Sequence, residues 1–184
     1  MPRALRYLVA FLFVLGLIAI LLYGFRRQSV LDRLLQPGPE GAAEVAVTLF
    51  FADAFGECLV AETRRLPAGD DLPLRVLQAL AEGPASPDLV GTIPTGARVL
   101  SVTVQDGLAI VDYSRELRDN HPGGSAGEML TAYAIVGSLV ALKGIDAVQI
   151  LLEGEVVETL VGHLIFSEPM TVPEEALQAG RICW

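Results

Sequence analysis

Residues 7–25 form an uncharged run of 19 residues, and this run is the strongest constraint on what the chain can fold into. At about 1.5 Å per residue, a helix of this length is about 28 Å long, close to the ~30 Å hydrocarbon core of a bilayer. Tyr7 and Tyr23 stand at its two ends, where aromatic side chains of membrane helices meet the interface. The run predicts a transmembrane helix within an N-terminal membrane anchor over residues 1–27.

A cleaved signal peptide is the alternative explanation of this run. The apolar core of a signal peptide is usually shorter, about 7–15 residues, and a small-x-small cleavage site follows it. Here the run ends at Arg26 and Arg27 without such a site, and the first 57 residues contain no Cys that could carry a lipid. We therefore expect a retained, single-pass anchor.

The orientation of the anchor follows from charge and length rather than from the arginines alone. Arg3 and Arg6 precede the run, and three arginines follow it by residue 33, so the count on the two sides is nearly equal. Because only six residues precede the run and the acidic part of the chain follows it, we expect the N-terminus in the cytoplasm. The globular domain then lies on the extracytoplasmic side of the cell membrane.

The charge is unevenly distributed along the chain. The whole sequence carries −9, but residues 41–184 hold 20 acids against 8 bases, a net charge of −12. A body this acidic repels phosphate, which excludes nucleic acid as a partner. Breaker residues at 36–41 indicate a linker, and the division that we expect is a linker over 28–42, a domain over 43–170 and a C-terminal tail over 171–184.

The clearest element of the domain is a β-hairpin over residues 97–113. Asp106-Gly107 is a strong signal for a two-residue turn, and alternating apolar residues flank it on both sides. A turn of this length places Leu100 opposite Tyr113 and gathers the apolar side chains on one face.

The remaining elements follow from periodicity and from start and stop signals. Asp70 or Asp71 is the expected N-cap of the first helix, and Ser125 and Glu128 stand at capping-box spacing at the start of the second. Further strands are expected over residues 44–51, 58–63, 147–152 and 156–160, and helices over 72–82 and 125–143. This order predicts an α+β fold with two helices packed on a largely antiparallel sheet.

No set of residues supports a named reaction, so we expect no catalytic residues and no enzyme. Ser101 and Asp112 face each other on the hairpin with no base between them. Residues 121–127 resemble a phosphate loop but lack its Lys, and Glu128 would repel an anion. The acid pairs at 70–71 and 174–175 stand at expected helix starts, where acids complement the helix dipole.

The histidines and cysteines indicate no metal site and no cofactor. His121 and His163 lie far apart in the sequence, and their spacing does not suggest a shared ligand set. Outside the cytoplasm, Cys58 and Cys183 would have the oxidising conditions in which disulfides persist. Whether these two cysteines pair stays open.

The second helix is apolar on all sides. Residues 129–142 contain no charged residue, whereas a helix packed on one sheet normally has a charged back. Such a helix must be covered on both sides. Either the first helix or the tail, through Ile182 and Trp184, covers the second face, or a partner protein does. The partner-binding candidates are Tyr133, Ile135, Leu139 and Leu142.

An ordered series of segments carries a resemblance to a known family. The segments are residues 48–53, 59–67, 79–84, 93–96, 106–114 and 148–154, followed by Gly162-His163. Together they resemble the GerMN domain of the GerM sporulation and spore-germination family over residues 45–169.

The resemblance implies a membrane-attached, extracytoplasmic protein of endospore-forming or related Gram-positive bacteria, with no established enzymatic activity. It also implies a fold similar to the ring-building modules of secretion-type complexes, and a link to the channel-like assembly between mother cell and forespore. This sequence departs from the family in three ways. It lacks a lipidation Cys, it has room for one domain rather than two, and it has Gly137-Ser138-Leu139 where the family often has Asn-Thr-Leu.

We therefore expect a membrane-anchored, non-enzymatic assembly or scaffold domain of the cell envelope. Its expected partners are the membrane, through residues 7–25, and envelope proteins or a second copy of the chain. The alternative is an extracytoplasmic small-molecule-sensing domain, with its site in the 114–127 loop near His121 and Asp119.

Overall fold

The computed structural model describes residues 43–184, so the expected anchor over residues 7–25 and the linker lie outside the described residues. In the part that is described, no helix is long and apolar enough to cross a membrane. Ala43–Trp184 form one compact unit. The unit contains its own buried core, which is the property of a domain that folds by itself.

The first sheet is built on a long hairpin of β1 (Glu44–Asp53) and β2 (Cys58–Pro67). Two short strands, β3 (Leu89–Val90) and β8 (Arg181–Cys183), extend it to the order β3-β1-β2-β8, with all neighbours antiparallel. The centre of β1, residues 49–52, is buried on both faces, which explains why its sequence is a continuous apolar run there.

The second sheet has the order β4-β5-β6-β7. It consists of β4 (Val99–Gln105), β5 (Leu108–Tyr113), β6 (Ala147–Leu152) and β7 (Glu155–Val156). The predicted hairpin forms β4 and β5, and both residues of its turn, Asp106 and Gly107, have positive φ, as a type I′ turn requires. By contrast, β5 and β6 are parallel because a helix connects them.

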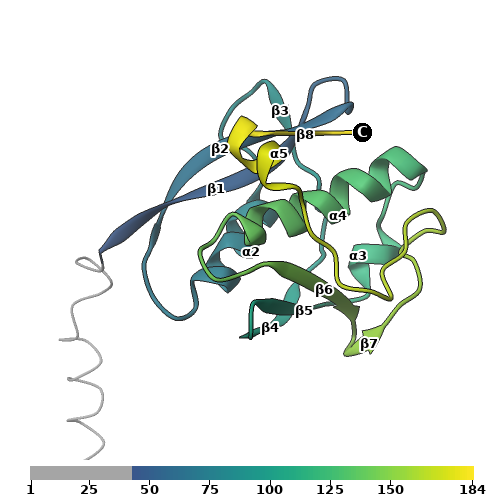
Figure 1. Cartoon of the computed structure of the whole chain (residues 1–184). Helices are drawn as coiled ribbons and strands as arrows, with labels where there is room; N and C mark the ends of the chain where they lie inside the picture. Colours follow the sequence, from purple (N-terminus) through teal and green to yellow (C-terminus); the bar gives the residue numbers. More distant parts are fainter. Residues whose placement is uncertain (1–42) are drawn as a thin grey trace, which may run out of the picture. The chain divides into compact units, whose positions relative to one another are not determined.

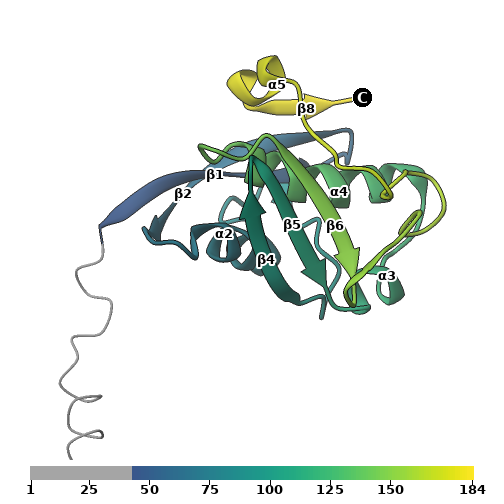
Figure 2. The same cartoon turned by 60° about the horizontal axis from the view of Figure 1, so that its bottom comes forward.

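Four helices complete the unit: α2 (Leu72–Glu82), α3 (Glu116–Asp119), α4 (Ser125–Val140) and α5 (Glu174–Ala179). α2 contacts β1, β2 and β4, and α4 contacts β1, β2 and β6, so each long helix contacts both sheets. Figure 1 shows α4 running across the molecule, and Figure 2 shows β4, β5 and β6 side by side in front of it. The α+β class is confirmed, but two sheets stand where one was predicted. The alternation of apolar and polar residues predicts each hairpin, but it does not predict which strands belong to the same sheet.

Three local predictions are wrong for identifiable reasons. A β-bulge after Val99 makes this residue, not Leu100, the partner of Tyr113. The strand expected over 156–160 ends at Val156, because the residues that follow leave β6 to bind α4. The tail over 171–184 is instead part of the unit, because it forms α5 and β8.

The predicted N-cap residue is confirmed for α2 and wrong for α4, and neither helix has a side-chain cap. Asp71 is the N-cap of α2, but its carboxylate makes no cap hydrogen bond and pairs with Arg75, one turn along the helix. Ser125 is the first residue of α4 rather than its cap, and no side chain caps this helix. Glu128, the expected partner in the capping box, faces the protein interior.

Gly137 allows two large side chains to approach α4. A Cβ built on Gly137 would lie 2.7 Å from Cδ1 of Ile182 and 3.2 Å from the ring of Phe50. The next residue, Ser138, accepts a hydrogen bond from the backbone N–H of Phe50 at 3.0 Å and so satisfies a donor that β2 does not reach. The Gly137-Ser138 pair therefore sets how closely α4 packs on β1.

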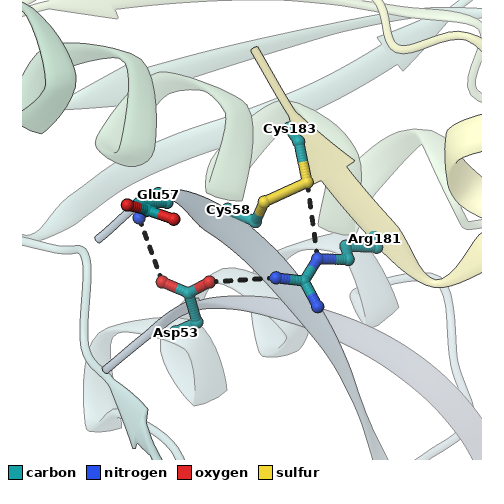
Figure 3. The surroundings of a disulfide bond; sticks show 5 residues. All are labelled: Asp53, Glu57, Cys58, Arg181 and Cys183. Atoms are coloured by element: carbon teal, nitrogen blue, oxygen red, sulfur yellow. Dashed lines mark hydrogen bonds and ion pairs between the residues drawn. A yellow bond between two sulfur atoms is a disulfide. The ribbon is translucent and has the colours of Figure 1, made fainter. Parts of the chain in front are cut away.

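A disulfide attaches the C-terminal strand to the sheet. Cys58 and Cys183 are register partners on β2 and β8, with their Cα atoms 4.4 Å apart, and their sulfur atoms are bonded. Figure 3 shows that Arg181 also reaches across to Asp53, at 3.1 Å. The backbone N–H of Glu57 donates to the same carboxylate and is the main cause that lowers the pKa of Asp53. Cys58 and Cys183 therefore pair, and their disulfide joins two residues that are 125 positions apart in the sequence.

Removing this cross-link is expected to destabilise the domain. In the loop-entropy view, a bond that closes a long loop restricts the unfolded chain, so the double variant Cys58→Ala/Cys183→Ala should lose about 2–4 kcal/mol of unfolding free energy. Urea unfolding of residues 43–184 without reductant measures the loss. A change below about 0.5 kcal/mol, the usual range for a neutral surface substitution, would contradict this expectation.

Candidate partner surface at the N-terminal half of helix α4

Residues 134–139 of α4 are enclosed by their own domain. Strands of both sheets and α2 contact it, and Ile182 lies against Gly137. Ile135 and Leu139 are fully buried there, so these two partner-binding candidates are core residues and no partner can contact their side chains in this fold. The all-round apolar character of the helix is explained by its position between elements of the same chain.

The other two candidates lie apart from each other and are partly exposed. Tyr133 is near the middle of α4, whereas Leu142 follows the end of the helix. Leu142 lines a groove of about 520 Å³ together with Val45, Leu72 and Val104. The structure therefore does not bring the four candidates together into one surface.

Around Tyr133 the chain gathers exposed apolar side chains from distant segments. Trp184 stacks on Tyr133 with ring centroids 6.1 Å apart, and 47% of Trp184 remains exposed. Ile165 is 64% exposed, and it lines a hollow of about 440 Å³ together with Tyr133.

The same surface continues along α4 toward the β1–β2 turn. Leu130 is one helical turn before Tyr133, and Gly56 of the turn lies beside it. Phe55 is 86% exposed and, with Leu130, lines a further hollow of about 290 Å³. We call this set the α4 surface, and its members are Phe55, Leu130, Tyr133, Ile165 and Trp184.

One buried carboxylate holds the loop that borders this surface. Glu128 is completely buried in the first turn of α4. Its Oε1 accepts the backbone N–H groups of Leu160 and Val161 at 2.8 and 3.0 Å. Its Oε2 accepts those of His163 and Leu164 at 2.8 and 3.1 Å. Four donors from a segment without regular structure thus end on one side chain, which fixes the segment that carries Ile165.

The residues of the expected sensing site bind one another. The hydroxyl of Thr131 donates to the carbonyl of Thr92 at 2.7 Å, so its oxygen is available to accept from Nε2 of His121 at 3.2 Å. The backbone N–H of Gly123 donates to Nδ1 of the same ring at 2.9 Å. Asp119 is paired with Arg115 on α3. The two residues named for the sensing site, His121 and Asp119, are therefore engaged within the protein.

Burial is the main cause that lowers the pKa of His121, and the nearby Glu128 carboxylate acts in the opposite direction. Both ring nitrogens already have partners that suit the neutral imidazole. Among the described residues, no group of three or more His, Cys, Asp or Glu side chains is placed to hold a metal ion.

Solved structures share this fold. The tandem GerMN domains of the sporulation protein GerM from Bacillus subtilis match with a TM-score of 0.61 and 22% identity, covering 70% of this chain and 46% of theirs. The first GerMN domain of GerM from Bacillus subtilis matches with a TM-score of 0.60 and 25% identity, over 69% of this chain and 97% of that one. A protein described as a lipoprotein from Clostridium perfringens matches with a TM-score of 0.51 and 22% identity, over 76% of this chain and 94% of that one.

These matches define the described unit as a GerMN-like domain. This chain spans less than half of the tandem-domain structure. The Germane family model, described as sporulation and spore germination, matches residues 48–158, so the chain belongs to that family. The resemblance found in the sequence is thus confirmed. No match was found among curated proteins.

Sequence reasoning missed two parts of the site. The buried role of Glu128 was hidden because an acid in a first helical turn is usually a cap or a dipole partner. Phe55 was not considered because a single aromatic residue in a turn has no periodicity. The only sequence signal for Glu128 was that it is the last charged residue before the uncharged stretch of α4.

Glu128→Gln should destabilise the domain strongly. The amide keeps one oxygen acceptor and turns an NH₂ group toward two buried N–H donors, so we expect a loss of about 2–4 kcal/mol in unfolding free energy. Urea unfolding of residues 43–184 measures it. Glu155→Gln, at an exposed position on β7, is the matched control and should change stability by less than about 0.5 kcal/mol. Equal effects of the two variants would contradict the role assigned to Glu128.

The unfolding free energy of the domain should also fall as the pH drops below the pKa of histidine in the unfolded chain. Because the folded-state pKa of His121 is lowered, its contribution is complete above the unfolded value of about 6.5 and is lost as the pH falls toward the folded value. Urea unfolding curves of the unsubstituted protein and of His121→Gln at pH 7.5, 6.5, 5.5 and 5.0 test this. The unfolding free energy of the variant should fall less over this interval. Parallel profiles for the two proteins would exclude His121 as the cause.

Proposed function

We propose that this domain is a non-enzymatic assembly module, anchored in the membrane and working on the extracytoplasmic side of the cell envelope in sporulation or spore germination. The observation that carries the proposal is the α4 surface. Its five large apolar side chains come from four separate segments of a body whose charge is −12 over residues 41–184. Trp184 stacks on Tyr133, Tyr133 and Ile165 line one hollow, and Leu130 and Phe55 line another. Single exposed apolar residues are ordinary, but a contiguous group marks a contact with another molecule.

The location is supported by three independent features. The apolar run over residues 7–25 is long enough to span a bilayer. The Cys58–Cys183 disulfide suits an oxidising compartment rather than the cytoplasm. One structural relative is described as a lipoprotein, and in this chain the apolar run would take the place of a lipid in holding the domain at the membrane.

The partner that fits the α4 surface is an envelope protein with an apolar or aromatic contact segment. Tyr133 and Trp184 offer a stacked aromatic pair, and hollows of about 290 and 440 Å³ lie beside Leu130 and Tyr133 of α4. Hollows of this size take individual side chains of a partner, and buried aromatic anchors of this kind contribute most of the binding energy in protein interfaces. Ile135 and Leu139 support the surface from inside the core.

Replacing the stacked pair should abolish complex formation while the fold is retained. Tyr133→Ser/Trp184→Ser removes two aromatic anchors that are both partly exposed, so we expect the native complex to shift to the size of the free protein. Native gel electrophoresis of membranes from sporulating cells of the source organism, solubilised in mild detergent, measures the size.

The matched control is Val156→Ser. It removes an apolar side chain that is 57% exposed on β7, outside the α4 surface, and should leave the complex unchanged. Thermal melting of each variant checks that the domain is folded. A complex of unchanged size in a folded Tyr133→Ser/Trp184→Ser variant would refute the proposed surface.

A further inference from the structure

Strand β4 has an open edge that is separate from the α4 surface. It is the first strand in the order β4-β5-β6-β7, and no described strand pairs with its other side. Gln105 and Leu108 flank the two-residue turn, so by the antiparallel alternation Ser101 and Thr103 bond to β5. The backbone N–H and C=O groups of Val102 and Val104 therefore point outward, away from the sheet.

Much of the other edges of the described sheets is covered or interrupted, although β1 before Ala52 has no strand on its β3 side. On the far side of the second sheet, Met170 bridges to Val148, and Gln149 donates to the carbonyl of Phe166. In the first sheet, β3 and β8 are only 2 and 3 residues long, and the free part of β2 carries the exposed Arg65. Short strands and charges of this kind prevent unwanted pairing between chains.

β4 lacks these protections over most of its length. Its sequence, VLSVTVQ, contains no charged residue, no Pro and no Gly. The bulge at Leu100 twists the first part of the strand, which leaves residues 101–105 as a regular open stretch. An uncharged, β-branched edge of this type is a template for another strand.

We propose that the occupant is β4 of a second copy of the chain, paired antiparallel about a two-fold axis at Thr103. In this register Val102 faces Val104 of the other copy, so the outward backbone groups of both residues form four hydrogen bonds across the axis. Thr103 of one copy faces Thr103 of the other, and Ser101 of one copy faces Gln105 of the other. Valine meets valine on one face of the joined sheet and polar residues meet on the other.

The register is set by the geometry of the strand. An axis at Val102 would carry the pairing across the bulge, where side chains lose the alternation that pairing needs. An axis between two residues would pair residues whose side chains lie on opposite faces of the sheet, whereas opposed residues of antiparallel strands share one face.

The pairing is expected to be weak in solution. Five residues per strand bury less surface than the ~1,200 Å² of a stable protein interface, and two copies of an acidic body repel each other. The test therefore traps the contact covalently, in the full chain and at about 0.15 M salt, where charges are screened beyond about 8 Å.

Thr103→Cys is the direct test. At a two-fold position that is not hydrogen-bonded, the two Cα atoms lie about 4.5 Å apart, within the range of a disulfide. Because Cys58 and Cys183 are already bonded, the new thiol is the one free to react. Mild oxidation should give a dimer on non-reducing gels. Ser101→Cys is the matched control, because its two copies would be about 14 Å apart at 3.4 Å per residue and should stay monomeric.

A second substitution separates pairing from random collision. Val104→Pro in the Thr103→Cys chain removes an N–H that points outward, so it spares the bonds to β5 and removes two of the four bonds between copies. We expect at least about fivefold less cross-linking, the effect of losing about 1 kcal/mol or more. Thermal melting checks the fold. Equal cross-linking of Thr103→Cys and Ser101→Cys, or no effect of Val104→Pro in a folded chain, would overturn the proposal. Neither result depends on Tyr133 or Trp184, so the two surfaces are tested separately.

Discussion

The buried carboxylate of Glu128 is the contact on which the arrangement of the α4 surface depends. Residues 157–173 contain no helix or long strand, yet they cross the molecule from β7 to α5. Glu128 accepts four of their backbone N–H groups and so gives this segment one position beside α4. Beyond this attachment, Ile165 lies beside Tyr133 and Met170 covers the edge of β6. One side chain thus orders a surface loop and protects a sheet edge.

A second attachment holds the C-terminal end of the chain. The Cys58–Cys183 bond and the Asp53–Arg181 pair hold β8 on β2, and β8 contains Ile182 and is followed directly by Trp184. Ile182 closes the core over Gly137, while Trp184 extends the aromatic surface from Tyr133. Residues 181–184 therefore complete both the core, through Ile182, and the candidate contact surface, through Trp184.

Local patterns in the sequence predicted most elements and the family, but not the long-range contacts. The Asp106-Gly107 turn and the stop at Gly83 were visible because they depend on neighbouring residues. The second sheet, the disulfide and the role of Glu128 depend on segments 30 or more residues apart, which periodicity cannot connect. The same limit explains the partner-binding candidates. The uncharged stretch of α4 showed that the helix is covered on all sides, but only the fold shows that Ile135 and Leu139 face the core while Tyr133 reaches solvent.

The most direct test of the central claim is to compare side-chain accessibility in the native envelope with that in the purified protein. Hydroxyl-radical footprinting read by mass spectrometry reports the oxidation rate of individual aromatic residues. If the α4 surface contacts a partner, Phe55, Tyr133 and Trp184 should be oxidised several-fold more slowly in native membranes, while Val156 on β7 keeps its rate. Equal rates for the three aromatic residues in both preparations would contradict the claim that this surface is where the domain meets its partner.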